Sequence, residues 1–268
     1  MRSETTAYWT FNEGSGQNLA STGTAADMTL QLGTSQTGYA DPAWVTEQGD
    51  TYLQFRTDGS PNYNALTLAS TANASALVLD TFTIEAFINL ATLPASGYTT
   101  NTPYSILELI NYDGSVGLIN YGLRVLTTTV NDESLTTVDF FYTYDDGGTT
   151  KTKSVTHNMA LETDAWYYVG VTRDSDGLIS LYINNDVVTS SNSPDTPSLT
   201  SPTLTIGASR TSSAYRRGLD GAISEVRISD VALSPDQLLI NIPEPSQLGL
   251  GAFGLLLTLA CYLRRHKN

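Results

Sequence analysis

The chain has 268 residues and carries 13 Lys and Arg against 27 Asp and Glu, a formal net charge of −14. Nucleic-acid phosphates are bound through Lys and Arg, so this acidic balance excludes a nucleic-acid partner. Cys261 is the only cysteine and His157 the only histidine before the last residues, which excludes internal disulfides, histidine-based triads and multi-histidine metal sites.

Short strands fill the sequence before residue 242. In the segment 81–89 apolar residues alternate with others, which places Phe82, Ile84, Ala86 and Ile88 on one face of a strand. Similar runs, separated by turn residues such as Asp-Gly, predict further strands at Tyr8–Phe11, Tyr52–Phe55, Ser105–Ile110, Leu118–Leu126, Val138–Tyr144, Trp166–Thr172, Leu178–Ile183, Leu204–Ile206 and Ala222–Ile228. Since no long stretch shows helical spacing, the sequence predicts an all-β antiparallel sandwich or barrel.

One segment of the body, residues 189–203, lacks a strand pattern. It is rich in Ser and Thr and contains Pro194, Pro197 and Pro202, which cannot donate to a strand ladder. We expect an exposed connection between two strands, with a functional lid or a glycosylated stretch as alternatives.

The end of the chain has a different composition. Residues 245–263 carry no charge, and at about 1.5 Å per residue a helix of that length spans the hydrocarbon core of a bilayer. The basic residues Arg264, Arg265 and Lys267 follow, and such residues favour the cytoplasmic side. The first 242 residues carry 10 basic and 26 acidic groups, a net charge of −16. We therefore expect a transmembrane helix with an acidic body outside; a core helix packed on the sandwich is the alternative.

The order Pro243-Glu244-Pro245, apolar run and basic end resembles a PEP-CTERM sorting signal. The resemblance implies a bacterial protein that is exported to the envelope and processed near these three residues by an exosortase, which then releases or transfers the body to the cell surface or extracellular matrix. A single-pass membrane protein that keeps its anchor is the alternative. No apolar run follows the first residues, so we expect either an upstream start or a shortened chain.

Blocks in the body resemble laminin G-like domains of the concanavalin A-like lectin/glucanase superfamily. In chain order they cover residues 7–16, 82–87, 166–172, 181–184, 219–228 and 232–235. The resemblance implies a two-sheet antiparallel jelly roll over residues 1–240, followed by the sorting signal over 241–268. This fold hosts lectins, adhesion modules, enzymes and spacers, so it does not by itself define a function.

Catalysis would require paired carboxylates, since one must donate a proton while the other attacks or activates water. The Glu-x-Asp-x-(x)-Glu spacing of the superfamily's glucanases does not occur here. The nearest substitutes, Glu85 and Glu108, lie on separate predicted strands, where a solvated or hydrogen-bonded carboxylate is the simpler explanation. We therefore expect no enzymatic activity and keep a polysaccharide-degrading enzyme as the alternative.

A structural calcium site is a further expectation. Glu13 in the opening turn, together with Asp220 and Glu225 near the closing strand, matches positions where relatives gather oxygen ligands. Calcium takes six to eight oxygens, so backbone carbonyls or water would complete the set. The alternative is turn chemistry for Glu13 and Asp220 and a buried hydrogen bond for Glu225.

Carbohydrate binding would use aromatic side chains, and the chain has 15 tyrosines. Tyr98, Tyr104, Tyr112 and Tyr121 fall around one loop-rich region, whereas Tyr142 and Tyr144 share a strand face; most of the tyrosines are expected to serve packing. We expect a non-catalytic module that binds exopolysaccharide or another envelope component, or acts structurally there. No cofactor is required; structural Ca²⁺ is the one addition considered.

Overall fold

The computed structural model describes residues 4–33, 41–55, 65–68, 71–98, 102–112, 117–130, 132–191, 193–210 and 215–241. In this part of the chain the elements are β1 (Thr5–Trp9), β2 (Asn18–Leu19), β3 (Leu30–Leu32), β4 (Ala43–Glu47), β5 (Asp50–Phe55), β6 (Leu66–Leu68), η1 (Thr71–Leu77), β7 (Phe82–Leu90), β8 (Tyr104–Tyr112), β9 (Gly117–Val130), β10 (Glu133–Asp145), β11 (Thr150–Thr156), β12 (Trp166–Arg173), β13 (Ile179–Ile183), β14 (Asp186–Ser190), β15 (Thr203–Ile206), β16 (Ser209–Arg210), β17 (Tyr215–Arg216), β18 (Gly221–Ser229), η2 (Pro235–Gln237) and η3 (Leu239–Asn241).

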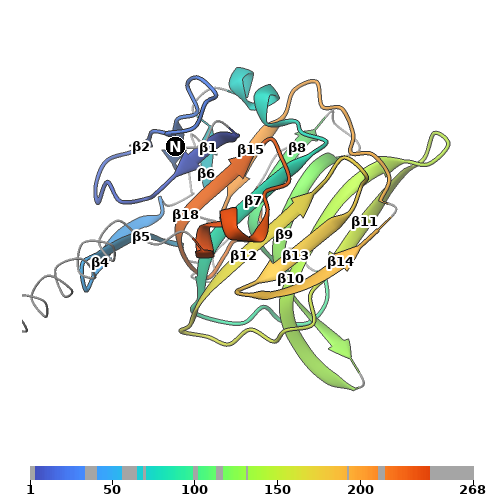
Figure 1. The fold of residues 1–268 in the computed structure, drawn as a ribbon. Helices are drawn as coiled ribbons and strands as arrows, with labels where there is room; N and C mark the ends of the chain where they lie inside the picture. Colours follow the sequence, from blue (N-terminus) through green and yellow to red (C-terminus); the bar gives the residue numbers. More distant parts are fainter. Residues whose placement is uncertain are drawn as a thin grey trace, which may run out of the picture. The chain divides into compact units, whose positions relative to one another are not determined.

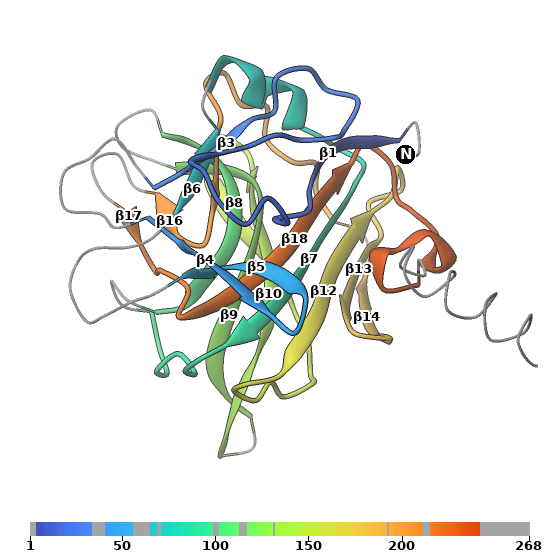
Figure 2. The same cartoon turned by 90° about the vertical axis from the view of Figure 1, so that its left-hand side faces the viewer.

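Two antiparallel sheets form the body (Figure 1; Figure 2). The first sheet has the order β14-β13-β12-β7-β18-β5-β4, and β1 also pairs with β18. The second sheet has the order β11-β10-β9-β8-β15-β6-β3-β2. The Phe82 ring of the first sheet lies 5.5 Å from the Tyr121 ring and 5.9 Å from the Phe140 ring of the second. The predicted two-sheet antiparallel sandwich is therefore confirmed.

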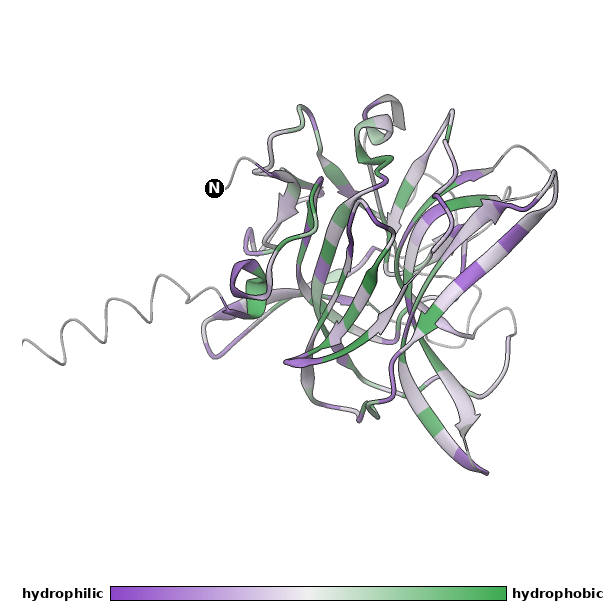
Figure 3. Cartoon of the chain, turned by 45° about the vertical axis from the view of Figure 1, so that its right-hand side comes forward, coloured by the Kyte–Doolittle hydropathy of each residue, from purple (hydrophilic) through white to green (hydrophobic). Residues whose placement is uncertain are grey.

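The central strand β7 shows how the sequence directs this packing. Phe82, Ile84, Ala86 and Ile88 are fully buried in the core, as the alternation predicts. The residues between them lie on the outer face of the first sheet, which is the face turned away from the second sheet. Figure 3 shows the same alternation of apolar and polar residues along other strands.

Some strand boundaries differ from the sequence prediction. The strand predicted at Tyr8–Phe11 ends at Trp9, and Phe11 has a φ of 48°, a left-handed conformation that cannot continue an extended strand. The short strands β2, β3 and β6 were not predicted because each has too few residues to show an alternation. The edge strand β11 was missed because it alternates Thr and Lys, a pattern that favours solvent and protects a sheet edge.

A second unit begins at Ser234. The domain boundary at residue 240 stays a prediction. No helix among the described residues is long and apolar enough to cross a membrane. The predicted transmembrane helix, the motif Pro243-Glu244-Pro245 and the basic residues Arg264, Arg265 and Lys267 lie outside the described residues.

Candidate functional site: a groove beside the hairpin of β10 and β11

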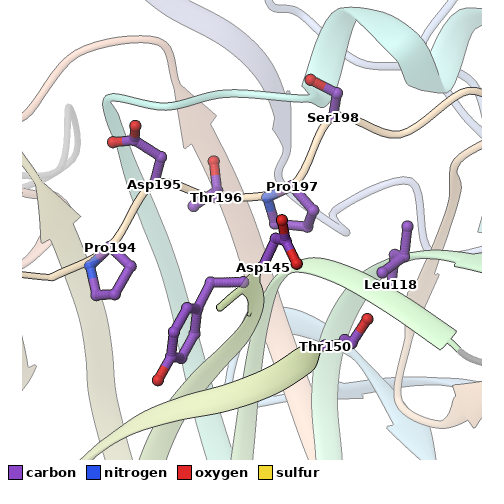
Figure 4. Close-up of a pocket in the computed structure, with 9 residues that line it drawn as sticks. Leu118, Asp145, Thr150, Pro194, Asp195, Thr196, Pro197 and Ser198 are labelled. Carbon is purple, nitrogen blue, oxygen red and sulfur yellow. The ribbon is translucent and has the colours of Figure 1, made fainter. Parts of the chain in front are cut away.

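A groove of about 480 Å³ lies between the hairpin of β10 and β11 and the connection that leads from β14 to β15 (Figure 4). This volume falls within the usual range for small-ligand sites. The described residues that line the groove are Leu118, Tyr144, Asp145, Thr150, Pro194, Asp195, Thr196, Pro197 and Ser198. The segment that lacked a strand pattern in the sequence thus forms one wall of the groove.

Hydrogen bonds from both sheets hold this wall in place. The carbonyl oxygen of Pro194 accepts hydrogen bonds from the Tyr142 hydroxyl at 2.8 Å and from the Arg173 guanidinium at 3.2 Å. The Asn120 amide donates to the carbonyl oxygen of Pro197 at 3.2 Å, and the Thr196 hydroxyl donates to Asp80 at 2.7 Å. The connection is therefore a fixed wall, because its carbonyl groups are tied to the sheets.

The opposite wall depends on a tight turn. Gly147 and Gly148 have φ values of 63° and 88°, and the backbones of Asp146 and Thr149 hydrogen-bond to each other across them. Two successive residues with positive φ form the two-residue hairpin turn that glycine favours. The turn keeps β10 and β11 in register, with Asp145 opposite Thr150 at the groove.

The groove offers an aromatic ring and polar groups that the protein leaves available. The Tyr144 ring is half-buried, and its hydroxyl has no hydrogen-bond partner among the described residues. The same holds for the hydroxyls of Thr150 and Ser198. Asp145 and Asp195 supply carboxylates, each on an exposed residue. An apolar ring face beside hydroxyls and carboxylates can bind a ligand that has both C–H faces and hydroxyl groups.

Two of the described residues that line the groove, Asp145 and Asp195, carry carboxylates. No residue that the structure describes as lining it is basic. The nearby Lys151 pairs with Asp146. The Arg173 side chain is only 4% exposed, and its guanidinium lies 3.6 Å from the carboxylate of Asp195. A ligand that carries carboxylate or phosphate groups would be repelled here.

The three carboxylates predicted to bind calcium do not come together. Glu13 is exposed after β1, Asp220 accepts a hydrogen bond of 2.6 Å from Thr92, and Glu225 accepts one from the Tyr8 hydroxyl. Among the described residues, no three His, Cys, Asp or Glu side chains are grouped so that they could hold a metal ion. The arrangement does not fit a shared site for these three residues, and calcium binding stays a prediction.

Glu85 belongs to a buried network on the outer face of the first sheet. It is fully buried and accepts hydrogen bonds from the Tyr168 hydroxyl at 2.9 Å and from Arg227 Nε at 2.6 Å. Burial, and then the charge of Glu85, raises the pKa of Tyr168, so the phenol keeps its proton and continues to donate it.

Glu108 lies on β8 of the second sheet and is 1% exposed. The Ser209 hydroxyl donates to it at 2.8 Å, and burial raises the pKa of Glu108 from 4.5 to about 6. Glu85 and Glu108 thus lie on different sheets, each with its own partners, and do not form a pair of catalytic carboxylates. The simpler explanation given by the sequence, a hydrogen-bonded Glu, is confirmed for both.

The region around Tyr98, Tyr104, Tyr112 and Tyr121, expected to be rich in loops, consists mostly of strands. Tyr104 and Tyr112 lie at opposite ends of β8, and Tyr121 is fully buried on β9; of the four, only Tyr98 lies in a loop. Tyr98 is 63% exposed and accepts a 3.0 Å hydrogen bond from Arg124, whose guanidinium also pairs with Asp139. The longer strands account for the error, because each of them extends into residues taken as loop.

The groove residues were only partly visible in the sequence. Tyr142 and Tyr144 share a strand face as predicted, and Tyr142 is fully buried whereas Tyr144 lines the groove. Asp145 and Asp195 were not considered, because about 50 residues separate them and nothing local indicates that they share a groove. The prolines of the connection were the one sequence feature that pointed to this wall of the groove, because they mark a segment that cannot join a sheet.

Comparison with solved structures shows which proteins share this fold. Domain 4 of the extracellular arabinanase AbnA from Geobacillus stearothermophilus, in complex with arabinotriose, matches with a TM-score of 0.55 and 13% identity over 89% of this chain and 97% of that one. The CBM40 domain of the Ruminococcus gnavus IT-sialidase bound to α2,3 sialyllactose matches with a TM-score of 0.50 and 14% identity over 80% and 97%. The binding domain of Paraclostridial Mosquitocidal Protein 1 matches with a TM-score of 0.54 and 12% identity over 89% of this chain and 51% of that one.

At these identities the likeness establishes a common fold. No curated protein sequence matches the chain significantly. A family model described as the concanavalin A-like lectin/glucanases superfamily matches residues 61–239, which is more than half of the sequence. The chain therefore belongs to the concanavalin A-like lectin/glucanase superfamily.

Proposed function

We propose that this protein is a non-catalytic carbohydrate-binding module whose groove, walled by β10, β11 and residues 194–198, binds a neutral glycan. The observation that carries the proposal is the fixed groove itself, whose lining combines the Tyr144 ring and its available hydroxyl with the carboxylates of Asp145 and Asp195. Because the walls are held by hydrogen bonds to the sheets, little order has to be gained on binding.

The ligand chemistry follows from these groups. A sugar ring has a C–H face that packs on an aromatic ring, and its hydroxyls can donate to carboxylates and bond to the hydroxyls of Tyr144, Thr150 and Ser198. The complexes of related folds with arabinotriose and sialyllactose support a carbohydrate ligand. None of the described residues that line the groove is basic, which favours a neutral sugar over an acidic one.

Export and sorting are the second part of the proposal. The order Pro243-Glu244-Pro245, apolar run and Arg264-Arg265 supports delivery to the bacterial envelope and processing by an exosortase. The module would then act at the cell surface or in the extracellular matrix, where exopolysaccharide is a partner. Loss of the residues after about position 242 from the intact mass of the mature protein would support sorting. A mass that retains the tail would favour a permanent single-pass anchor instead.

A glycan array tests the binding function. We expect the wild-type body to bind neutral oligosaccharides, and Tyr144→Ala and the double variant Asp145→Asn, Asp195→Asn to bind them more weakly. Binding that is unchanged in both variants would reject the groove. Release of reducing sugar from a bound polysaccharide, abolished by the Asp145 and Asp195 changes, would instead place the protein among the polysaccharide-degrading enzymes.

A further inference from the structure

A second surface lies on the outer face of the first sheet, where β12, β7, β18 and β5 are neighbours (Figure 1). The strand register places four residues in one row across this face: Trp166, Asn89, Ala222 and Gln54. Tyr52 precedes Gln54 by two residues and lies on the same face. None of these residues lines the groove, so the surface is separate from it.

Two aromatic rings of this surface are in contact with each other. The Trp166 and Tyr52 rings lie 5.3 Å apart, edge to face at 72°. Ala222, which lies in the same row, has a small side chain that is only 3% exposed. The Tyr52 hydroxyl donates to Glu47 at 3.1 Å, which fixes that ring and, through the ring contact, the indole. Trp166 nevertheless stays 42% exposed, so a large and restrained apolar surface faces solvent.

Polar groups around the indole lack partners within the protein. Among the described residues, neither the Trp166 indole N–H nor the half-buried Asn89 amide makes a hydrogen bond. The Gln54 amide nitrogen donates to the carbonyl oxygens of Gly221 and Phe55, whereas its oxygen has no partner in the described part of the chain. The row therefore offers donors and acceptors beside an aromatic ring and contains no charged side chain.

We propose that Trp166, Tyr52, Asn89 and Gln54 form a second binding surface for a neutral polysaccharide. The ring supplies apolar contact for a sugar face, and the amides and indole N–H match sugar hydroxyls. The row is uncharged, and the carboxylate of Glu47 beside Tyr52 disfavours an anionic polymer, so the surface suits an uncharged one. With the groove, it gives one module two places to hold glycan, so one module can join two chains or bind one chain with avidity.

Affinity electrophoresis of the body in gels that contain hydroxyethyl cellulose, galactomannan or β-1,3-glucan tests the proposal. The variants are Trp166→Ala and Asn89→Ala for the new surface and Tyr144→Ala for the groove. Leu178→Ala is the matched control, because Leu178 is a large apolar residue of similar exposure, 39%. In the Tyr144→Ala background, we expect Trp166→Ala to raise the apparent dissociation constant obtained from the retardation about tenfold. We expect Leu178→Ala to leave it unchanged. Circular dichroism and the melting temperature verify that each variant is folded.

The outcomes separate the two sites. If Trp166→Ala and Asn89→Ala migrate like their parents in both backgrounds, the second surface is rejected and the groove is unaffected. If Trp166→Ala abolishes retardation and Tyr144→Ala does not, the groove is rejected and the second surface stands. No retardation of the wild type in any gel rejects both. Self-association in sedimentation velocity that Trp166→Ala removes, with no change in the gels, would also overturn the glycan assignment.

Discussion

The Tyr142 hydroxyl donates a 2.8 Å hydrogen bond to the carbonyl oxygen of Pro194, which joins the core of the second sheet to the wall of the groove. The Tyr142 ring is fully buried, and Tyr144, two residues along the same strand face, lines the groove itself. One strand thus supplies both a support for the wall and a ring for the proposed ligand. Because proline leaves its own carbonyl available, the wall can be tied without a sheet ladder.

Removing this hydrogen bond should loosen the wall. Tyr142→Phe keeps the ring but leaves the carbonyl group of Pro194 with Arg173 alone, and we expect a loss of about 1 kcal/mol in the free energy of unfolding. Urea unfolding measures this loss. Tyr144→Phe is the control, because the Tyr144 hydroxyl has no partner among the described residues. An equal loss in both variants would contradict the role given to Tyr142.

Substitution of Arg124 should lower the free energy of unfolding more than substitution of any exposed Lys or Arg. Its guanidinium lies 4.0 Å from the Phe141 ring and 2.6 Å from Asp139, which is 1% exposed. Arg124→Met leaves a buried carboxylate without its cation, and we expect a loss of about 3–5 kcal/mol in unfolding free energy. The double variant Arg124→Met, Asp139→Asn should recover part of that loss. Additive losses in the double-mutant cycle would show that the pair is not coupled.

The raised pKa of Glu108 predicts that the free energy of unfolding depends on pH. Burial raises the pKa of Glu108 from 4.5 to about 6, so the folded protein holds this proton where the unfolded chain has released it. The stability that this proton provides is complete below about pH 4.5 and is lost as the pH rises through about 6. Since one pKa unit corresponds to about 1.36 kcal/mol, the loss is about 2 kcal/mol.

The variant Glu108→Gln isolates this effect from other titrating groups. Glutamine has nearly the shape of protonated glutamate and can still accept the hydrogen bond from Ser209, but it does not titrate. Urea unfolding of both proteins between about pH 4 and about pH 7 should show the wild type losing stability relative to the variant as the pH rises. A constant difference across this range would mean that the pKa of Glu108 is not raised.

The sequence predicts a strand where the strand itself shows an alternation of apolar and polar residues. The alternation in β7 identified its core face because a strand covered on one side must bury every second residue. The same reasoning failed for β4, β11 and β14, which lie at or beside sheet edges and expose most of their residues. A mostly solvated strand needs no apolar alternation, so its sequence resembles that of a loop.

The candidate site was harder to predict because it is assembled over long separations. Asp145 and Asp195 meet at the groove only because the connection after β14 crosses from the first sheet to the second. For the same topological reason Glu85 and Glu108, on consecutive long strands, lie on different sheets. The acidic character of the groove was foreseeable in part, since the first 242 residues carry a charge of −16.

That charge should determine which polysaccharides bind. We expect a uronate-containing polymer to bind at least about tenfold more weakly than a neutral polymer of the same linkage at low salt. The gap should shrink as salt screens the repulsion and should also shrink in the double variant Asp145→Asn, Asp195→Asn. Asp132→Asn, an exposed change in the turn between β9 and β10, is the control. Tighter binding of the acidic polymer would contradict the repulsion expected from Asp145 and Asp195.

Titration calorimetry of the body with a neutral oligosaccharide that scores on the array tests the central claim most directly. Tyr144→Ala removes the ring of the groove, and Tyr182→Ala removes an equally half-buried tyrosine from the outer face of the first sheet. We predict that Tyr144→Ala raises the dissociation constant at least about tenfold and that Tyr182→Ala leaves it within about twofold of the wild-type value. Wild-type affinity in Tyr144→Ala would show that the groove is not the carbohydrate-binding site.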